Sequence, residues 1–121
     1  MTLDEAAQPG RPADEDDTFG VSAQRVEDRV VLEMTGELDI SGTELALSAA
    51  RSALEAQPLP TTLQVDGGGL EFVDSSGIAA LLRIRDLAAA ANVPFVVTEA
   101  SVSFRRVIEL AGLEGTFFPP A

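Results

Sequence analysis

The sequence predicts an α/β fold built on a mixed, mostly parallel sheet of about four or five strands. Segments with the two-residue period of a strand alternate with segments that have the 3.6-residue period of a helix. The first two strand-like segments are separated only by Glu27 and Asp28, which predicts an opening hairpin and hence a mixed sheet. The predicted order is β-β-α-β-α-β-α-β.

The opening hairpin is predicted over residues 19–26 and 29–36, where the second segment alternates between buried and exposed positions until Gly36. A helix is expected next, from a capping box in which Ser41 is the N-cap and Glu44 is at N3. This helix is expected to run to about Gln57, before a proline.

The second half predicts a short strand over 62–65, which is followed by a flexible glycine turn over 66–69 and by the segment 70–73. A helix follows from Asp74 to about Ala91, and a strand covers 94–98. Ser101 or Ser103 is expected to cap a third helix, and a last short strand is expected over 116–118. The buried stripe of the third helix is formed by four apolar residues: Phe104, Val107, Ile108 and Ala111.

Composition divides the chain of 121 residues into two parts. Residues 1–17 contain six acids, one arginine and almost no apolar side chain, which predicts a disordered acidic tail that acts as a solubilising extension. Residues 18–121 are expected to form one domain. The net charge is −12 and about −5 of it lies in the tail, so about −7 remains on the domain.

Absent residue types exclude most catalytic classes. The chain has no Cys, His, Lys, Trp or Tyr. It therefore lacks the usual zinc ligands, the base of serine and cysteine triads, and the lysine of phosphate-binding loops. We expect a protein that is not an enzyme and that uses no catalytic residue, metal or cofactor.

Charge and hydropathy also limit the partners and the compartment. A net charge of −12 disfavours nucleic acid and anionic membranes and favours a basic protein surface. No apolar run approaches the roughly 18–20 residues of a membrane-spanning helix. The N-terminus has no basic region followed by an apolar one, so no signal peptide is predicted and the expected compartment is the cytoplasm.

The helix after Asp74 is predicted to have two apolar faces. Its core face is formed by residues that cluster on one side of the helix: Gly77, Ala80, Leu81, Ile84, Leu87, Ala88 and Ala91. Ile78 and Leu82 point away from that face, on the same side as Ser75, so we expect them to be partly exposed. A hydroxyl beside exposed aliphatic side chains indicates an interaction surface with a switch at its edge. The alternative is that a loop or another packing element covers this pair.

A phosphate on Ser75 would add about −1.5 to −2 charges at neutral pH. The N-terminus of the helix favours that charge, whereas Asp74, and Asp39 if it lies close, disfavour it. Both acids follow predicted strands, and the carboxyl ends of parallel strands share one edge of a sheet. Phosphorylation is therefore expected to change the outer surface, with loss of one partner or gain of another.

Three segments resemble the STAS family, most closely its stand-alone bacterial anti-sigma factor antagonists: Thr35-Gly36-Glu37-Leu38-Asp39, Leu70-Glu71-Phe72-Val73-Asp74-Ser75-Ser76-Gly77-Ile78 and Phe104-Arg105-Arg106-Val107-Ile108-Glu109-Leu110-Ala111-Gly112-Leu113. The resemblance covers about residues 19–118. It implies a mixed sheet with helices packed largely on one side. The acidic tail is not part of the family pattern.

The resemblance also implies a partner-switching mechanism. In the family, the serine directly after the aspartate is phosphorylated by the partner, an anti-sigma factor with a GHKL-type serine kinase domain. The unphosphorylated antagonist binds this kinase and frees the sigma factor. The phosphorylated form releases the kinase until a PP2C-type phosphatase removes the phosphate.

Matched residue by residue, the phosphoacceptor is Ser75. The residues around it are Asp39, Asp74, Ser76 and Gly77, with Ser76 as a secondary hydroxyl position. The expected partner contacts are Ile78, Leu82, Ser41 and Thr43. Two other uses of the family remain as alternatives: a constitutive adaptor subunit of a lipid-transport ABC complex, and a component of a stress-sensing assembly.

Overall fold

The structure is a computed structural model that describes residues 18–119. The predicted acidic tail therefore lies outside the described residues. The helices and strands follow in the order β2 (Gly20–Val26), β3 (Arg29–Leu38), α2 (Thr43–Glu55), β4 (Thr62–Val73), α3 (Ser75–Ala90), β5 (Phe95–Ala100), α4 (Val102–Leu110) and α5 (Glu114–Phe117).

Four strands form one sheet in the order β2-β3-β4-β5. β2 pairs antiparallel with β3 across the turn at Glu27, and the β3–β4 and β4–β5 pairs are parallel. The predicted mixed, mostly parallel sheet is therefore confirmed. β3 continues past Gly36, which has a φ of 81° and lies where the register with β4 shifts, so this glycine marks a bulge and not the end of the strand.

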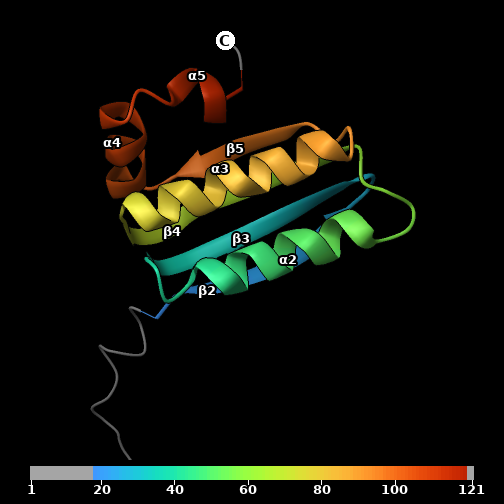
Figure 1. Cartoon of the computed structure of the whole chain (residues 1–121), viewed down its shortest axis with the longest axis horizontal. Helices are drawn as coiled ribbons and strands as arrows, with labels where there is room; N and C mark the ends of the chain where they lie inside the picture. The colour runs from blue at the N-terminus through green and yellow to red at the C-terminus, as the bar shows by residue number, and fades with distance from the viewer. Residues whose placement is uncertain (1–17, 120–121) are drawn as a thin grey trace, which may run out of the picture.

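The helices pack on one face of the sheet, as Figure 1 shows for α2 and α3. The alternate strand residues that face them are buried, as in Val30, Leu32 and Met34 of β3. The core face predicted for α3 is confirmed, since Leu81 and Ile84 are fully buried. α2 and α3 also contact each other, so α3 is covered by more than the sheet.

The predicted glycine turn over 66–69 is wrong, because β4 runs without interruption from Thr62 to Val73. The reason lies in packing from a distant part of the chain. A Cβ on Gly67 would stand 2.5 Å from the ring of Phe104 in α4, and one on Gly69 would stand 2.8 Å from the Thr35 side chain in β3. These glycines allow close approach within a strand, which local sequence does not reveal.

The predicted last strand over 116–118 is also wrong, because these residues belong to the short helix α5 and its C-cap. Phe117 is fully buried, and its ring packs edge-to-face on Phe95 with the ring centroids 6.0 Å apart. The guanidinium of Arg105 stacks on the neighbouring Phe118 ring at 4.5 Å from the ring centroid. The helical turn therefore directs the two neighbouring rings differently: the Phe117 ring points into the core, and the Phe118 ring lies under the Arg105 guanidinium.

Ser101 is the N-cap of α4, which decides between the two serines that the sequence proposed. Its hydroxyl accepts the N–H of Phe104 at 3.1 Å and also donates to the carbonyl of Leu70 in β4. In α4 itself Phe104 and Ile108 are buried as predicted, whereas Ala111 is exposed because the helix ends at Leu110. The cap thus ties the start of α4 to the sheet.

Ser101→Ala is expected to destabilise the protein by about 1–2 kcal/mol, because it removes an N-cap and leaves the Leu70 carbonyl without its donor. Ser103→Ala is the matched control, since Ser103 is exposed and makes no side-chain hydrogen bond among residues 18–119. Urea unfolding of both variants measures the difference. Equal losses in the two variants would contradict the assignment of the cap.

Candidate functional site

The ends of β3 and β4 meet at one edge of the sheet, which we call the switch edge. Asp39 directly follows β3, and Asp74 directly follows β4 and precedes Ser75, the first residue of α3. The N–H of Asp74 donates to the carbonyl of Leu38 at 3.3 Å, so the start of α3 lies against the end of β3. A Cβ on Gly77 would stand 2.5 Å from that same carbonyl oxygen, which shows how closely the two segments approach.

The first turn of α3 presents Ser75 to solvent. Asp74 is the N-cap with extended backbone, and its carboxylate accepts the N–H of Gly77 at 3.0 Å. Ser75 is exposed, and its hydroxyl makes no hydrogen bond to any residue between 18 and 119. The hydroxyl is therefore accessible, and the adjacent acid is already engaged by the helix that it caps.

Asp39 organises the loop between β3 and α2. Its carboxylate accepts the N–H of Ser41 at 3.0 Å and the hydroxyl of Ser41 at 2.6 Å. The capping box predicted for Ser41 and Glu44 is therefore wrong: Asp39 holds the Ser41 side chain, and the N-cap is Gly42, with no side-chain cap. A Cβ on Gly42 would stand 2.9 Å from the Phe19 ring, so close packing selects glycine there.

The hydrogen bonds from the Ser41 hydroxyl and N–H lower the pKa of the Asp39 carboxyl below its ordinary value of 3.8. Because the folded-state pKa is lowered, these hydrogen bonds stabilise the folded protein fully above pH 3.8. This stabilisation is lost as the pH falls through the folded-state pKa. Asp39 is thus ionised at neutral pH, and it places a fixed negative charge at the switch edge.

A hollow lies between the first turns of α2 and α3, and it is lined by Ser76, the residue that follows Ser75. Its volume is about 210 Å³, and its walls combine apolar and polar groups from Ile40, Thr43, Leu47, Ser76, Ala79, Ala80 and Arg83. Two of the sequence-predicted site residues, Thr43 and Ser76, thus come together at this hollow. The Thr43 hydroxyl donates to the carbonyl of Ile40 at 3.1 Å.

Ile78 does not form the exposed patch that the sequence predicts, because its side chain is only 8% exposed and belongs to the core. Leu82 is half-buried and packs against the same core. Arg85 and Ala89 follow Ile78 and Leu82 at helical spacing, so the four residues lie along one flank of α3. Arg85 and Ala89 line a groove together with residues of β5 and α5. The first two turns of this flank therefore pack into the core, whereas Arg85 and Ala89 further along it are exposed.

Other apolar side chains are exposed at the switch edge, and the sequence reasoning missed them. Six large apolar residues are the most exposed in the described range, and four of these lie on segments at this edge. We call these four the apolar rim: Ile40, Leu45, Phe72 and Val102. Ile40 is 77% exposed in a turn between polar residues, and an apolar residue in such a turn is the signal that could have found it.

The segments at the switch edge carry more acids than bases. Glu37 lies at the end of β3, and Asp39 and Asp74 directly follow β3 and β4. Glu44 lies in the first turn of α2, whereas Arg83 lines the hollow from a position more than two turns into α3. Within residues 18–119, no group of three or more acidic side chains is arranged to hold a metal ion. The geometry combines an accessible hydroxyl, fixed negative charge and exposed apolar side chains, which suits protein recognition.

Comparison with known proteins agrees with this geometry. A family model described as "Mlab, STAS domain" matches residues 21–119. The chain belongs to the STAS domain family. The family match spans every strand and helix described above except the first residue of β2.

Solved STAS structures share the fold over most of this chain. An anti-sigma factor antagonist from Mycobacterium paratuberculosis is 24% identical with a TM-score of 0.73, and the match covers 86% of this chain and 88% of that chain. The antagonist SpoIIAA in its unphosphorylated form is 26% identical with a TM-score of 0.63, covering 86% and 89%. The phosphorylated form of Bacillus SpoIIAA is 24% identical with a TM-score of 0.62, covering 86% and 92%.

The STAS fold is thus shared with anti-sigma factor antagonists of similar length. A search of curated proteins finds no sequence match to this chain. Among residues 18–119, no helix is both long enough and apolar enough to span a membrane.

Proposed function

We propose that this STAS protein is an anti-sigma factor antagonist whose binding to its partner is switched off by phosphorylation of Ser75. The partner is an anti-sigma factor with a GHKL-type serine kinase domain, and a PP2C-type phosphatase resets the cycle. The unphosphorylated protein binds the kinase, and the sigma factor is released.

The observation that carries this proposal is the position of Ser75 at the switch edge. It is an exposed hydroxyl on the first turn of α3, one residue before Ser76 in the hollow and at the edge of the sheet whose segments carry the apolar rim. A kinase can reach such a hydroxyl without unfolding the chain. A partner that covers the apolar rim would also cover the hydroxyl, so binding and phosphorylation compete for one surface.

Phosphorylation is expected to oppose binding through local electrostatics. The phosphate adds about −1.5 to −2 charges. The Asp74 carboxylate already accepts the Gly77 N–H, and Asp39 is ionised in the adjoining loop, so the site offers the phosphate little internal compensation. The phosphate therefore stays on the outer surface, where an interface that buries it without a paired cation loses stability.

The proposal is tested by incubating the full chain with candidate GHKL anti-sigma kinases and ATP, then reading the intact mass and the peptide map. We expect one phosphate on Ser75, no phosphate on Ser75→Ala, and normal phosphorylation of the matched variant Ser76→Ala. Phosphorylated protein is expected to bind the kinase more weakly than the unmodified protein does.

A different result would favour the constitutive adaptor. If no candidate kinase transfers phosphate and Ser75→Ala leaves every complex unaltered, the switch is excluded for those partners. Stable co-purification with an ATPase that has membrane subunits would then favour an adaptor of a lipid-transport complex.

A further inference from the structure

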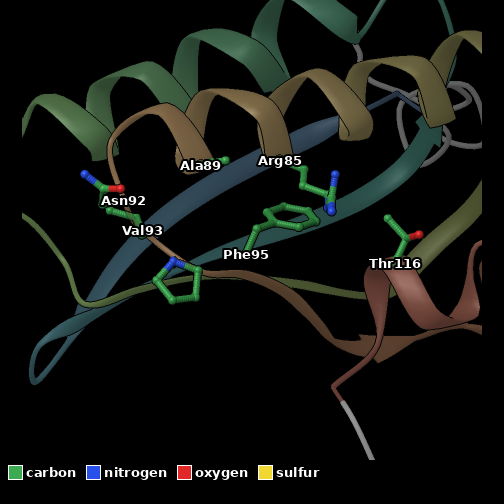
Figure 2. Close-up of a pocket in the computed structure, with 7 residues that line it drawn as sticks. Arg85, Ala89, Asn92, Val93, Phe95 and Thr116 are labelled. Carbon is green, nitrogen blue, oxygen red and sulfur yellow. The ribbon is translucent and has the colours of Figure 1, made fainter.

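A second concave site lies on the other flank of α3, away from the switch edge. This groove has a volume of about 430 Å³ and opens between the second half of α3, the start of β5 and α5 (Figure 2). Arg85 lies ten residues after Ser75, which corresponds to about 15 Å along a helix. The groove is thus separate from the surface proposed to bind the kinase.

The floor of the groove is apolar. Val93, Pro94 and Phe95 line it, and the Phe95 ring is fixed from behind by its edge-to-face contact with the buried Phe117. Figure 2 shows the Phe95 ring in the middle of the groove, beneath α3. A ring held in place by a buried neighbour provides a preformed flat surface for another flat apolar group.

Three polar groups stand around this floor. Arg85 reaches from α3 to the ring of Phe95, Thr116 lies across from it on α5, and Asn92 lies at the opposite end (Figure 2). In the described part of the chain, the side chains of Thr116 and Asn92 make no hydrogen bond. Their polar groups are therefore available to a ligand.

Arg85 is only weakly engaged within the protein. Its nearest carboxylate is that of Asp86 at 3.9 Å, and the side chains of both residues are more than 40% exposed. Such a long, solvated pair contributes little. The guanidinium can thus turn its two-pronged donor face toward an anion in the groove.

We infer that this groove binds a small aromatic carboxylate, with its ring against Phe95 and its carboxylate at Arg85. A carboxylate fits better than a phosphate monoester because the groove offers one arginine, Asp86 stands beside it, and the domain carries a net charge of about −7. One cation can balance a single negative charge, whereas a doubly charged group would keep an unpaired charge. The inference is independent of the proposed kinase partner.

The test is an NMR titration of the full chain with 2-naphthoate, monitored at the backbone amides of Ala89, Phe95 and Thr116 and at the Arg85 side-chain N–H. A dissociation constant on the order of 1 mM or below is expected. Arg85→Gln is expected to weaken binding at least about tenfold. The neutral 2-naphthamide, the ring-free acetate and phenyl phosphate should each bind more weakly than 2-naphthoate.

Arg83→Gln is the matched control, because it removes the same charge from the same helix about 200° away around the helix axis. It should leave the affinity within about twofold of the wild type, since charges separated by solvent are screened. Equal loss in both arginine variants, equal binding of the amide and the carboxylate, or no localised shift up to 10 mM would each overturn the inference. No partner protein enters the experiment, so its failure leaves the proposed function standing.

Discussion

Gly77→Ala is expected to destabilise the protein by about 2 kcal/mol or more and to move the first turn of α3 away from β3. The added Cβ would stand 2.5 Å from the Leu38 carbonyl oxygen and 2.9 Å from side-chain carbons of both Leu38 and Val73. A backbone carbonyl in a paired strand cannot move aside cheaply. The clash opposes a gain in helix propensity of about 1 kcal/mol for alanine, and the clash should dominate.

Gly115→Ala is the matched control for this prediction. Gly115 lies in α5, and a Cβ at that position would meet nothing within 4 Å. This variant should therefore keep or raise the stability by up to about 1 kcal/mol. Urea unfolding of both variants gives the comparison, and a Gly77→Ala variant as stable as the wild type would contradict the close packing of α3 on β3.

Periodic features of the sequence predict most of the fold. The core face of α3 follows from the 3.6-residue spacing of Leu81, Ile84 and Ala88, all fully buried. The Asp74 cap follows from a residue type that favours this position, and the hairpin follows from two alternating segments two residues apart. Each of these signals depends on neighbours in the sequence, which is why sequence reasoning finds them.

Two of the errors share one physical origin, since each depends on contacts that are distant in the sequence. The glycines of β4 resemble a turn until Phe104 is placed over Gly67. Ile78 is predicted to be exposed, but tertiary packing places its side chain in the core cluster. The Ser41 error is a local one: the Ser41 hydroxyl donates to the Asp39 carboxylate two residues away, and residue type alone does not distinguish this arrangement from an N-cap.

The candidate site was accordingly predicted in part. Asp39 and Ser75 follow neighbouring parallel strands, and this placement at one edge follows from the strand order alone. The apolar rim could not be derived in the same way, because its members come from α2, β4, α4 and a turn. Their common location depends on the tertiary fold.

Ser75→Glu is expected to weaken binding to the cognate anti-sigma kinase at least about 30-fold, equivalent to about 2 kcal/mol. The substitution places a permanent charge on an exposed position between the N-cap acid and the hollow. An interface that covers the apolar rim would have to desolvate this charge beside Asp39 and Asp74, with only Arg83 available in the hollow. Most of the loss should therefore be seen in faster dissociation.

The control for this charge is Ser52→Glu, which adds the same group to the exposed surface of α2 in its last turns, at the opposite end from the switch edge. It should change the affinity by less than about twofold, because a distant solvated charge is screened. Surface plasmon resonance with the immobilised kinase measures both dissociation rates, and thermal unfolding shows whether each variant is folded. If Ser75→Glu binds as tightly as Ser52→Glu while both are folded, the charge at Ser75 does not control binding, and the exposed hydroxyl at the start of α3 must be explained by its helix position alone.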